Sequence, residues 1–184
     1  MVALSLAGMG FKQANEAVRA ALGSSDSLEL HDVRAQRYLG CALGERASLE
    51  IFGTPGNDMG CFLAGGRIEV HGSAQDQVGN TMGGGLIAIH GRCGDAAGYA
   101  MRGGRIFVRD GCGWRVGINI KEYGDTVPAI VVGGDAGCFL GEYMAGGCIV
   151  LLGRAGAHIA SGMHGGSIFL AHPLERSLVP EGII

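Results

Sequence analysis

Proline and clustered positive charge are both scarce in this sequence. It has 4 prolines among 184 residues, and its 36 glycines follow no Gly-X-Y period, so a collagen-like chain is excluded. A hydrophobic fraction of 47% is too high for a disordered linker. Lys and Arg form no block and the net charge is −3, which argues against a nucleic acid or an anionic membrane as partner.

Long apolar runs and closely spaced cysteine pairs are also missing. No segment approaches the roughly 20 apolar residues that a membrane helix needs. The N-terminal MVALSLAGMGFK lacks the basic leader of a signal peptide. The 6 cysteines contain no C-x-x-C pair, which is typical of reduced thiols rather than of a zinc site or a disulfide framework. We therefore expect a soluble, cytoplasmic chain with one hydrophobic core.

Glycine is the residue in excess, and the glycines are periodic. The double glycines that begin at residues 65, 84, 103, 146 and 165 recur every 19 residues apart from one longer step. That step contains two periods and an insertion of 5 residues within KEYGDTVP, residues 121–128. Internal repeats of about 20 residues indicate a solenoid, in which each repeat is one coil.

The aliphatic residues follow the same period. Aligned on it, the second and fourth residues of every unit are branched aliphatics, from Leu49 and Ile51 to Ile168 and Leu170. Alternation with period two predicts a strand with one buried face, and like residues at like positions predict strands stacked in register. The sequence therefore indicates an all-β fold, a parallel β-solenoid of about 7 or 8 coils.

The boundaries of the solenoid follow from this pattern. Residues 27–46 form a looser first coil, which offers Leu28 and Leu30 to the aliphatic columns, so we expect residues 27–184 to be the β-helix. We expect residues 1–26 to be an N-terminal segment, in which residues 11–23 form a short amphipathic helix that caps the end of the solenoid. Structural glycines at the corners, where the backbone needs a positive φ, are expected at Gly60, Gly79, Gly98, Gly117 and Gly141.

The glycine-rich segments do not match a nucleotide-binding motif. GTPGNDMG (53–60) and GCGWRVG (111–117) fit neither the G-x-G-x-x-G pattern nor the P-loop pattern. Their glycines lie in the solenoid's own columns, so their role is architectural. We therefore expect that this chain binds no cofactor itself.

Two stacked acidic residues are the candidate catalytic pair. Asp76 and Asp95 share a column, so their carboxyl groups could lie about 5 Å apart, the separation found in retaining glycosidases. Asn57 and Trp114 continue the column, and Asx side chains commonly close turns, so turn capping is the stronger interpretation. The catalytic alternative is a stand-alone hydrolase that acts on glycans or esters.

Histidines stack in a second column. His71 and His90 occupy the same position in successive units, and Arg109 follows them. Two imidazoles about 5 Å apart could share a metal ion, but the sequence offers no obvious third ligand. An exposed polar edge at the strand ends is the other interpretation.

The remaining nucleophiles also have structural interpretations. Cys93 and Cys112 share a column of small residues, so we expect both to pack inward as small hydrophobic side chains, although a disulfide between coils is conceivable. Ser161 stands near His158 and His164, which leaves a weak hydrolase hypothesis open. No G-x-S-x-G nucleophile elbow occurs.

The insertion is the one place where the solenoid departs from its period. An insertion in a repeat array forms a loop on one face, and that face is often the binding face. Lys121, Glu122, Tyr123 and Asp125 are therefore the predicted partner contacts. A solvated loop is the alternative interpretation.

The same coils resemble a known family. GNDMGCFLAGGRIEVHGSAQDQVGNTMGGG, GYAMRGGRIFVRDGCGWRVGINIKEYGDTVP and IVVGGDAGCFLGEYMAGGCIVLLG are similar to the GXGXG domain of glutamate synthase. The similarity is greatest to the form in which this domain is a separate short polypeptide, as in archaeal-type glutamate synthases, and extends over residues 15–169. The β-helical subunit of formylmethanofuran dehydrogenase has a related coil pattern, but INIKEY and FLGEYMAGG favour glutamate synthase.

The resemblance implies a right-handed β-helix that carries no catalytic residue and holds other domains together. Glutamate synthase converts glutamine and 2-oxoglutarate to glutamate, using a glutaminase domain and a flavin domain with an iron–sulfur cluster. We accordingly expect a scaffold subunit whose partners are a glutaminase-like subunit and a subunit with FMN and an iron–sulfur cluster. The alternatives are a scaffold subunit of another redox complex, such as formylmethanofuran dehydrogenase, and a homo-oligomer. The chain departs from the family pattern at residues 83–85 and at Cys93, Cys112 and Cys138.

Overall fold

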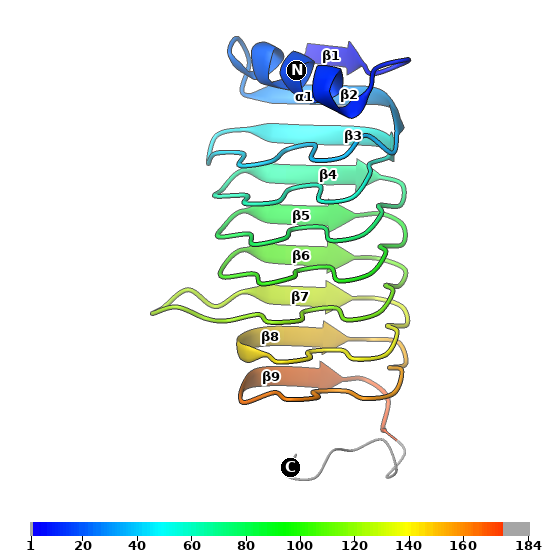
Figure 1. The fold of residues 1–184 in the computed structure, drawn as a ribbon, viewed down its shortest axis with the longest axis vertical. Coiled ribbons are helices and arrows are strands. Elements are labelled where there is room, and N and C mark those ends of the chain that lie inside the picture. Colours follow the sequence, from blue (N-terminus) through cyan, green and yellow to red (C-terminus); the bar gives the residue numbers. More distant parts are fainter. Residues whose placement is uncertain (1, 175–184) are drawn as a thin grey trace.

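The computed structural model describes residues 2–174. Their strands form one parallel sheet that is wound into a β-helix (Figure 1). The strands pair in chain order, so each strand contacts the one before it and the one after it. The predicted right-handed parallel β-helix with a short N-terminal helix is confirmed. The elements are β1 (Val2–Ser5), α1 (Phe11–Leu22), β2 (Ser27–Arg34), β3 (Ser48–Thr54), β4 (Arg67–His71), β5 (Leu86–Ile89), β6 (Arg105–Val108), β7 (Ala129–Val132), β8 (Ala145–Leu151) and β9 (Gly165–Leu170).

The register between strands is the one that the 19-residue alignment predicts. Leu49 pairs with Ile68, Ile68 pairs with Ile87, and the column continues strand by strand to Ile168. Leu28 of the looser first coil pairs with Leu49, as expected. From Leu28 through β8, the side chains of this column have no exposed surface. Full burial of one such side chain stabilises the fold by roughly 1.5–3 kcal/mol, so the column is a main part of the core.

Strand β1 was not expected from the sequence. Val2 pairs with Leu28 and Leu4 pairs with Leu30, so residues 2–5 extend the sheet by one strand beyond the first coil. The N-terminal segment therefore contains a strand as well as the helix. Leu6, directly after β1, is fully buried and joins the same core.

Helix α1 lies at the N-terminal end of the stack, next to β1 and β2 (Figure 1). It buries Ala14 and Val18 in the core, and Asn15 Nδ2 donates a hydrogen bond of 2.8 Å to the carbonyl oxygen of Arg37 in the first coil. The helix ends one residue earlier than expected, and its C-cap Gly23 is right-handed, with φ −66°. No helix within residues 2–174 has the length and apolar character to cross a membrane.

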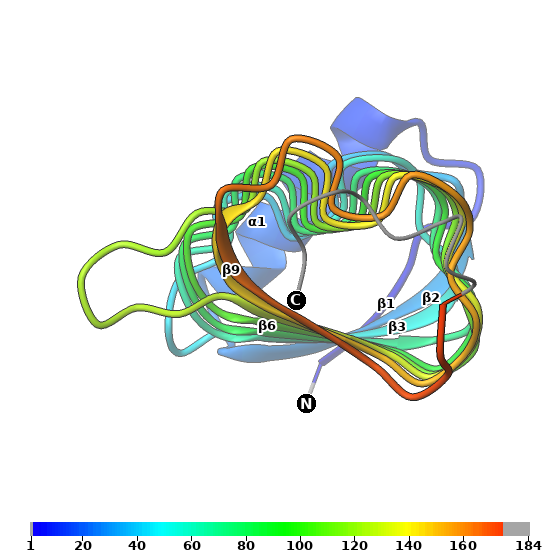
Figure 2. The same ribbon diagram turned by 90° about the horizontal axis from the view of Figure 1, so that it is seen from below.

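Each coil has two opposite walls (Figure 2). The strand wall is the sheet, and the turn wall consists of the six-residue segments 37–42, 57–62, 76–81, 95–100, 114–119, 138–143 and 157–162. Every second residue of the turn wall is left-handed: in 95–100, Ala96, Gly98 and Ala100 have φ 54°, 71° and 53°. The wall is still hydrogen-bonded between coils, because Ala96 N donates to Trp114 O at 2.7 Å and Gly98 N donates to Val78 O at 2.8 Å.

The central residue of the turn-wall segments is glycine, apart from Ala160, and both a close approach and a positive φ require glycine there. The five glycines expected at the corners have φ between 66° and 71°. A Cβ on Gly60 would lie 2.7 Å from Cδ1 of Ile87, and a Cβ on Gly79 would lie 2.6 Å from Cδ1 of Ile106. An isoleucine from a later coil thus fills the space that a side chain would need.

Candidate functional site

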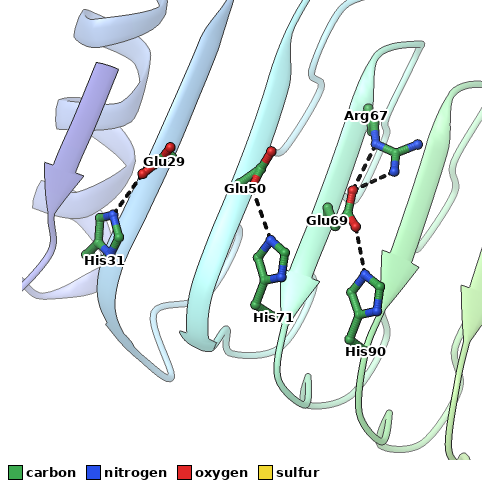
Figure 3. A network of polar contacts seen from close by, with 7 residues as sticks. All are labelled: Glu29, His31, Glu50, Arg67, Glu69, His71 and His90. Carbon is green, nitrogen blue, oxygen red and sulfur yellow. Dashed lines mark hydrogen bonds and ion pairs between the residues drawn. The ribbon is translucent and has the colours of Figure 1, made fainter. Parts of the chain in front are cut away.

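A polar ladder of glutamates and histidines runs along the outer face of strands β2–β4 and ends at His90, directly after β5 (Figure 3). The glutamates occupy one register column, because Glu29 pairs with Glu50 and Glu50 pairs with Glu69. Each carboxylate lies beside an imidazole Nε2: the pairs are His31–Glu29 at 3.2 Å, His71–Glu50 at 3.1 Å and His90–Glu69 at 2.7 Å. The ladder is half-exposed, so its charges are available to a partner.

The imidazoles belong to a stack of four rings. His31 lies 4.7 Å from Phe52, Phe52 lies 4.5 Å from His71, and the predicted stacking of His71 on His90 is confirmed at 5.5 Å between centroids. The rings are nearly parallel, as in the stacked arrangements that aromatic side chains adopt. Arg109 follows His90 in the column and pairs with Asp110 at 2.8 Å.

Glu69 is the most strongly held acid of the ladder. Arg67 Nη2 lies 2.5 Å from its Oε2, and His90 Nε2 lies 2.7 Å from its Oε1. The Arg67 guanidinium, followed by the His90 imidazole, lowers the pKa of the Glu69 carboxyl. Within residues 2–174, no group of three or more His, Cys, Asp or Glu side chains is placed to hold a metal ion.

Asp76 and Asp95 are used as caps between coils. Asp76 Oδ1 accepts a hydrogen bond of 2.9 Å from the backbone N–H of Asp95, and Asp95 Oδ1 accepts one of 2.8 Å from the N–H of Trp114. Asn57 Oδ1 accepts the N–H of Asp76 in the same way, at 3.3 Å. Each side chain thus bonds the backbone of the next coil, not its own turn. The side chains therefore differ from the expected closure of their own turns, because their hydrogen bonds join successive coils.

Cys93 and Cys112 pack inward as expected. They pair as a parallel β-bridge, and each is 4% exposed. The hydrogen bond with Cys112, together with burial, raises the pKa of the Cys93 thiol well above its usual range. Both cysteines are free thiols in this structure.

The residues around Ser161 do not form a triad. His158 stacks on Phe139 with 4.8 Å between ring centroids, and His164 Nδ1 lies 3.3 Å from the carbonyl oxygen of Gly162. Across the part of the chain that the structure describes, no hydrogen bond joins Ser161 to either histidine.

The insertion loop, residues 121–128, projects from the solenoid just before β7 (Figure 1). Tyr123 and Thr126 exchange two backbone hydrogen bonds of 3.2 and 3.1 Å, and the Tyr123 residue is 81% exposed. Glu122 Oε2 accepts a hydrogen bond of 3.0 Å from the backbone N–H of Gly147, so Glu122 anchors the loop to the next coil. Of the four predicted partner contacts, Lys121, Tyr123 and Asp125 remain exposed without this anchoring role.

A hollow of about 410 Å³ lies at the base of the insertion loop. Its lining residues are Gly83, Arg102, Lys121, Glu122, Tyr123 and Thr126. Arg102, which the sequence analysis did not single out, fixes this wall: its Nη1 donates to the carbonyl oxygens of Ala100 at 2.8 Å and Asn119 at 3.0 Å. The hollow is therefore a preformed feature at the place where the loop leaves the solenoid.

Two buried acids on the turn wall were also missed. Glu142 is 7% exposed, and its Oε2 lies 3.3 Å from Arg115 Nη1, an ion pair without hydrogen-bond geometry. Asp58 is 8% exposed and accepts a hydrogen bond of 3.0 Å from Asn80 Nδ2. Charged side chains at turn-wall positions were the signal that could have indicated such pairs.

Comparisons with known proteins agree with this architecture. Residues 29–178 match the model of the family described as "GXGXG motif". The chain is 41% identical over 189 aligned residues to the uncharacterized protein MJ1350 of Methanocaldococcus jannaschii, and the alignment covers 95% of this chain and 72% of that protein.

A solved structure has a similar fold. It is a chain of the formyltransferase/hydrolase complex of Methylorubrum extorquens in complex with methylofuran, with a TM-score of 0.69 and 24% sequence identity. The similarity covers 92% of this chain and 72% of that chain, and at this identity it concerns the fold alone. The family match, in contrast, spans most of the coils and agrees with the resemblance seen in the sequence. This chain belongs to the GXGXG motif family.

Proposed function

We propose that this chain is a non-catalytic scaffold subunit of a glutamate-synthase-like complex, in which it holds a glutaminase-like subunit against a subunit with FMN and an iron–sulfur cluster. The observation that carries the proposal is the insertion loop. It interrupts the 19-residue period of the coils, and it presents Lys121, Tyr123 and Asp125 to a partner beside a hollow. Membership of the GXGXG motif family supports the same role.

Such a scaffold would act through proximity. Holding an ammonia-producing site against a flavin site shortens the path of a labile intermediate and limits its loss to solvent. A rod in which every coil is hydrogen-bonded to the next can keep two partners at a fixed separation. In the candidate catalytic residues Asp76 and Asp95, the carboxylate accepts a hydrogen bond from a backbone N–H group, which is consistent with a role in structure.

A second complex is favoured by the structural comparison. The Methylorubrum extorquens protein with this fold belongs to a formyltransferase/hydrolase complex, so a β-helix of this kind can serve as one subunit of a formyl-transferring assembly. Under this alternative, the chain would be a scaffold subunit of a complex such as formylmethanofuran dehydrogenase.

Purification of the tagged chain from its native host tests the proposal. We expect a glutaminase-like subunit and a subunit with FMN and an iron–sulfur cluster to be recovered with it. Recovery with a molybdenum or tungsten enzyme would favour the formyl-transferring complex instead. Recovery of the chain alone, as a homo-oligomer, would contradict both scaffold hypotheses and direct attention to Asp76 and Asp95.

Loop variants test where the partner binds. Replacing both Lys121 and Tyr123 with Ala should reduce the recovered partner at least tenfold, because Tyr is enriched among interface residues whose truncation costs about 2 kcal/mol or more, and about 1.4 kcal/mol is a tenfold change in affinity. Trp114→Ala is the matched control, since Trp114 is also an exposed aromatic residue but lies on the turn wall. Equal recovery with the loop variant and the control would show that the loop is not the contact.

A further inference from the structure

Two cysteines of neighbouring coils stack at the N-terminal end of the turn wall. Cys41 and Cys61 occupy the same position in their coils, because backbone hydrogen bonds flank both of them: Gly60 N donates to Leu39 O, and Ala42 N donates to Cys61 O, each at 2.9 Å. Neighbouring coils lie about 4.8 Å apart. This spacing falls within the range of roughly 4.4–6.8 Å between Cα atoms that a disulfide requires.

The two thiols differ in their access to solvent. Cys61 is 3% exposed, and burial together with the neighbouring Cys41 thiol raises the pKa of Cys61 to about 12. Cys41 is only partly buried and lines a surface hollow of about 240 Å³ next to helix α1. The Cys41 thiol is therefore accessible from outside, and the Cys61 thiol lies beside it in the next coil.

The side chains that line this hollow carry a net positive charge. It comprises Phe11, Lys12, Asn15, Glu16, Arg19, Tyr38 and Cys41. Lys12 and Arg19 outnumber the single acid, Glu16. Arg37 stands over the Tyr38 ring at 5.0 Å at the edge of the hollow, but its charge is paired with Asp58 Oδ2 at 3.5 Å. A small anionic molecule fits this environment better than a neutral or cationic one.

We propose that Cys41 and Cys61 form a thiol–disulfide exchange site, at which an acidic low-molecular-weight disulfide oxidises the pair to a disulfide between coils. This site is independent of the proposed scaffold role. In the first step, the Cys41 thiolate attacks one sulfur of the small disulfide, whose S–S bond breaks and releases one thiolate. The product is a mixed disulfide on Cys41.

The second step uses the buried cysteine. Cys61 gives up its proton to solvent as its sulfur attacks Sγ of Cys41, and the second small thiolate leaves; both small thiolates then take up protons from solvent. The two protein thiols lose two electrons and two protons, and the small disulfide gains them as two thiols. Because the two cysteines are stacked, the second step needs no large movement of the coils.

The protein contains its own control pair. Cys93 and Cys112 are stacked in the same manner, paired as a parallel β-bridge, but both are 4% exposed. If stacking alone decided reactivity, both pairs would be oxidised equally. If access decides it, as we infer, the buried pair stays reduced under native conditions.

Incubation of the full chain with oxidised glutathione tests the proposal. After alkylation and proteolysis, we expect one cross-linked peptide joining Cys41 to Cys61, while Cys93 and Cys112 remain alkylatable once the protein is denatured. Cys61→Ser should instead accumulate a glutathionyl adduct on Cys41, since the attacking thiol of the second step is missing. Absence of the cross-link, or equally fast oxidation of Cys93 and Cys112, would overturn the proposal.

The charge of the hollow is tested separately. The neutral disulfide of 2-mercaptoethanol should react severalfold more slowly than oxidised glutathione. Replacing Lys12 and Arg19 together with Gln should remove most of this difference and leave the rate with the neutral disulfide unchanged. Equal rates for both disulfides with the original chain would contradict an acidic substrate.

Discussion

The strand wall and the turn wall are made by the same coils, yet they constrain the sequence differently. On the strand wall, the outward residue between the two core positions changes freely, from Glu50 to Phe107 to Val150. On the turn wall, every second residue is left-handed, and the central glycine lies against an isoleucine of a later coil. The difference teaches that backbone conformation and close approach, as well as burial, decide which positions of this fold can vary.

Gly98→Val should break the turn wall and have the largest effect. Gly98 has φ 71°, a conformation that strains a β-branched residue, and its Cβ would contact Ile130 Cδ1. We expect a loss of about 3 kcal/mol or more in the free energy of unfolding, measured by urea denaturation. The control is Ala100→Gly, which should be neutral or stabilising by up to about 1 kcal/mol, because glycine removes the strain of a φ of 53°. Unchanged stability of Gly98→Val would show that the assigned register is wrong.

Removing one hydrogen-bonded cap between coils should lower the free energy of unfolding by an intermediate amount. Asp95→Ala deletes the acceptor for the N–H of Trp114, so we expect a loss of about 1 kcal/mol in the free energy of unfolding. Asp95→Asn keeps an acceptor oxygen and should remain close to the original chain. Loss of an enzymatic activity in the Asn variant, with stability unchanged, would instead support the hydrolase interpretation of Asp76 and Asp95.

Glu69→Gln on the strand wall should have the smallest effect. Arg67 and His90 lower the pKa of Glu69 below its ordinary value of 4.5, so the charged form stabilises the fold above that pH, and the contribution is lost as the pH falls through the lowered pKa. We expect a loss of about 0.5–1 kcal/mol at pH 7, discounted for solvent screening, that shrinks below pH 4.5. A difference between the two chains that does not change with pH would contradict this assignment.

The strand wall could be predicted from the sequence in detail. Its columns are visible because each contributes a branched aliphatic residue every 19 residues, and the pairing of Leu49 with Ile68 and of Ile68 with Ile87 follows directly. The insertion was located for the same reason, as a break in the period. Strand β1 was missed because four residues before the helix belong to no repeat and match no column by spacing.

The turn wall and the polar ladder could not be predicted to the same extent. Left-handed residues such as Gln77, Ala96 and Arg115 carry no chemical signal for a positive φ, which sequence reasoning assigns to glycine or asparagine. Long-range stacking imposes the conformation instead. Phe52 lies one 19-residue period before His71, so the repeat could have placed it in this column, whereas His31 was missed because the looser first coil does not keep the period.

The insertion loop leaves the pairing across it undisturbed: Arg105 still pairs with Ala129 and Ile106 with Ile130. The position of a coil along the axis of the β-helix is therefore independent of the number of residues in its loops. Every coil advances the structure by one step of about 4.8 Å. A loop on one coil can therefore be enlarged without moving the other coils. The separation of two surface features along the axis changes only when a whole coil is added or removed between them.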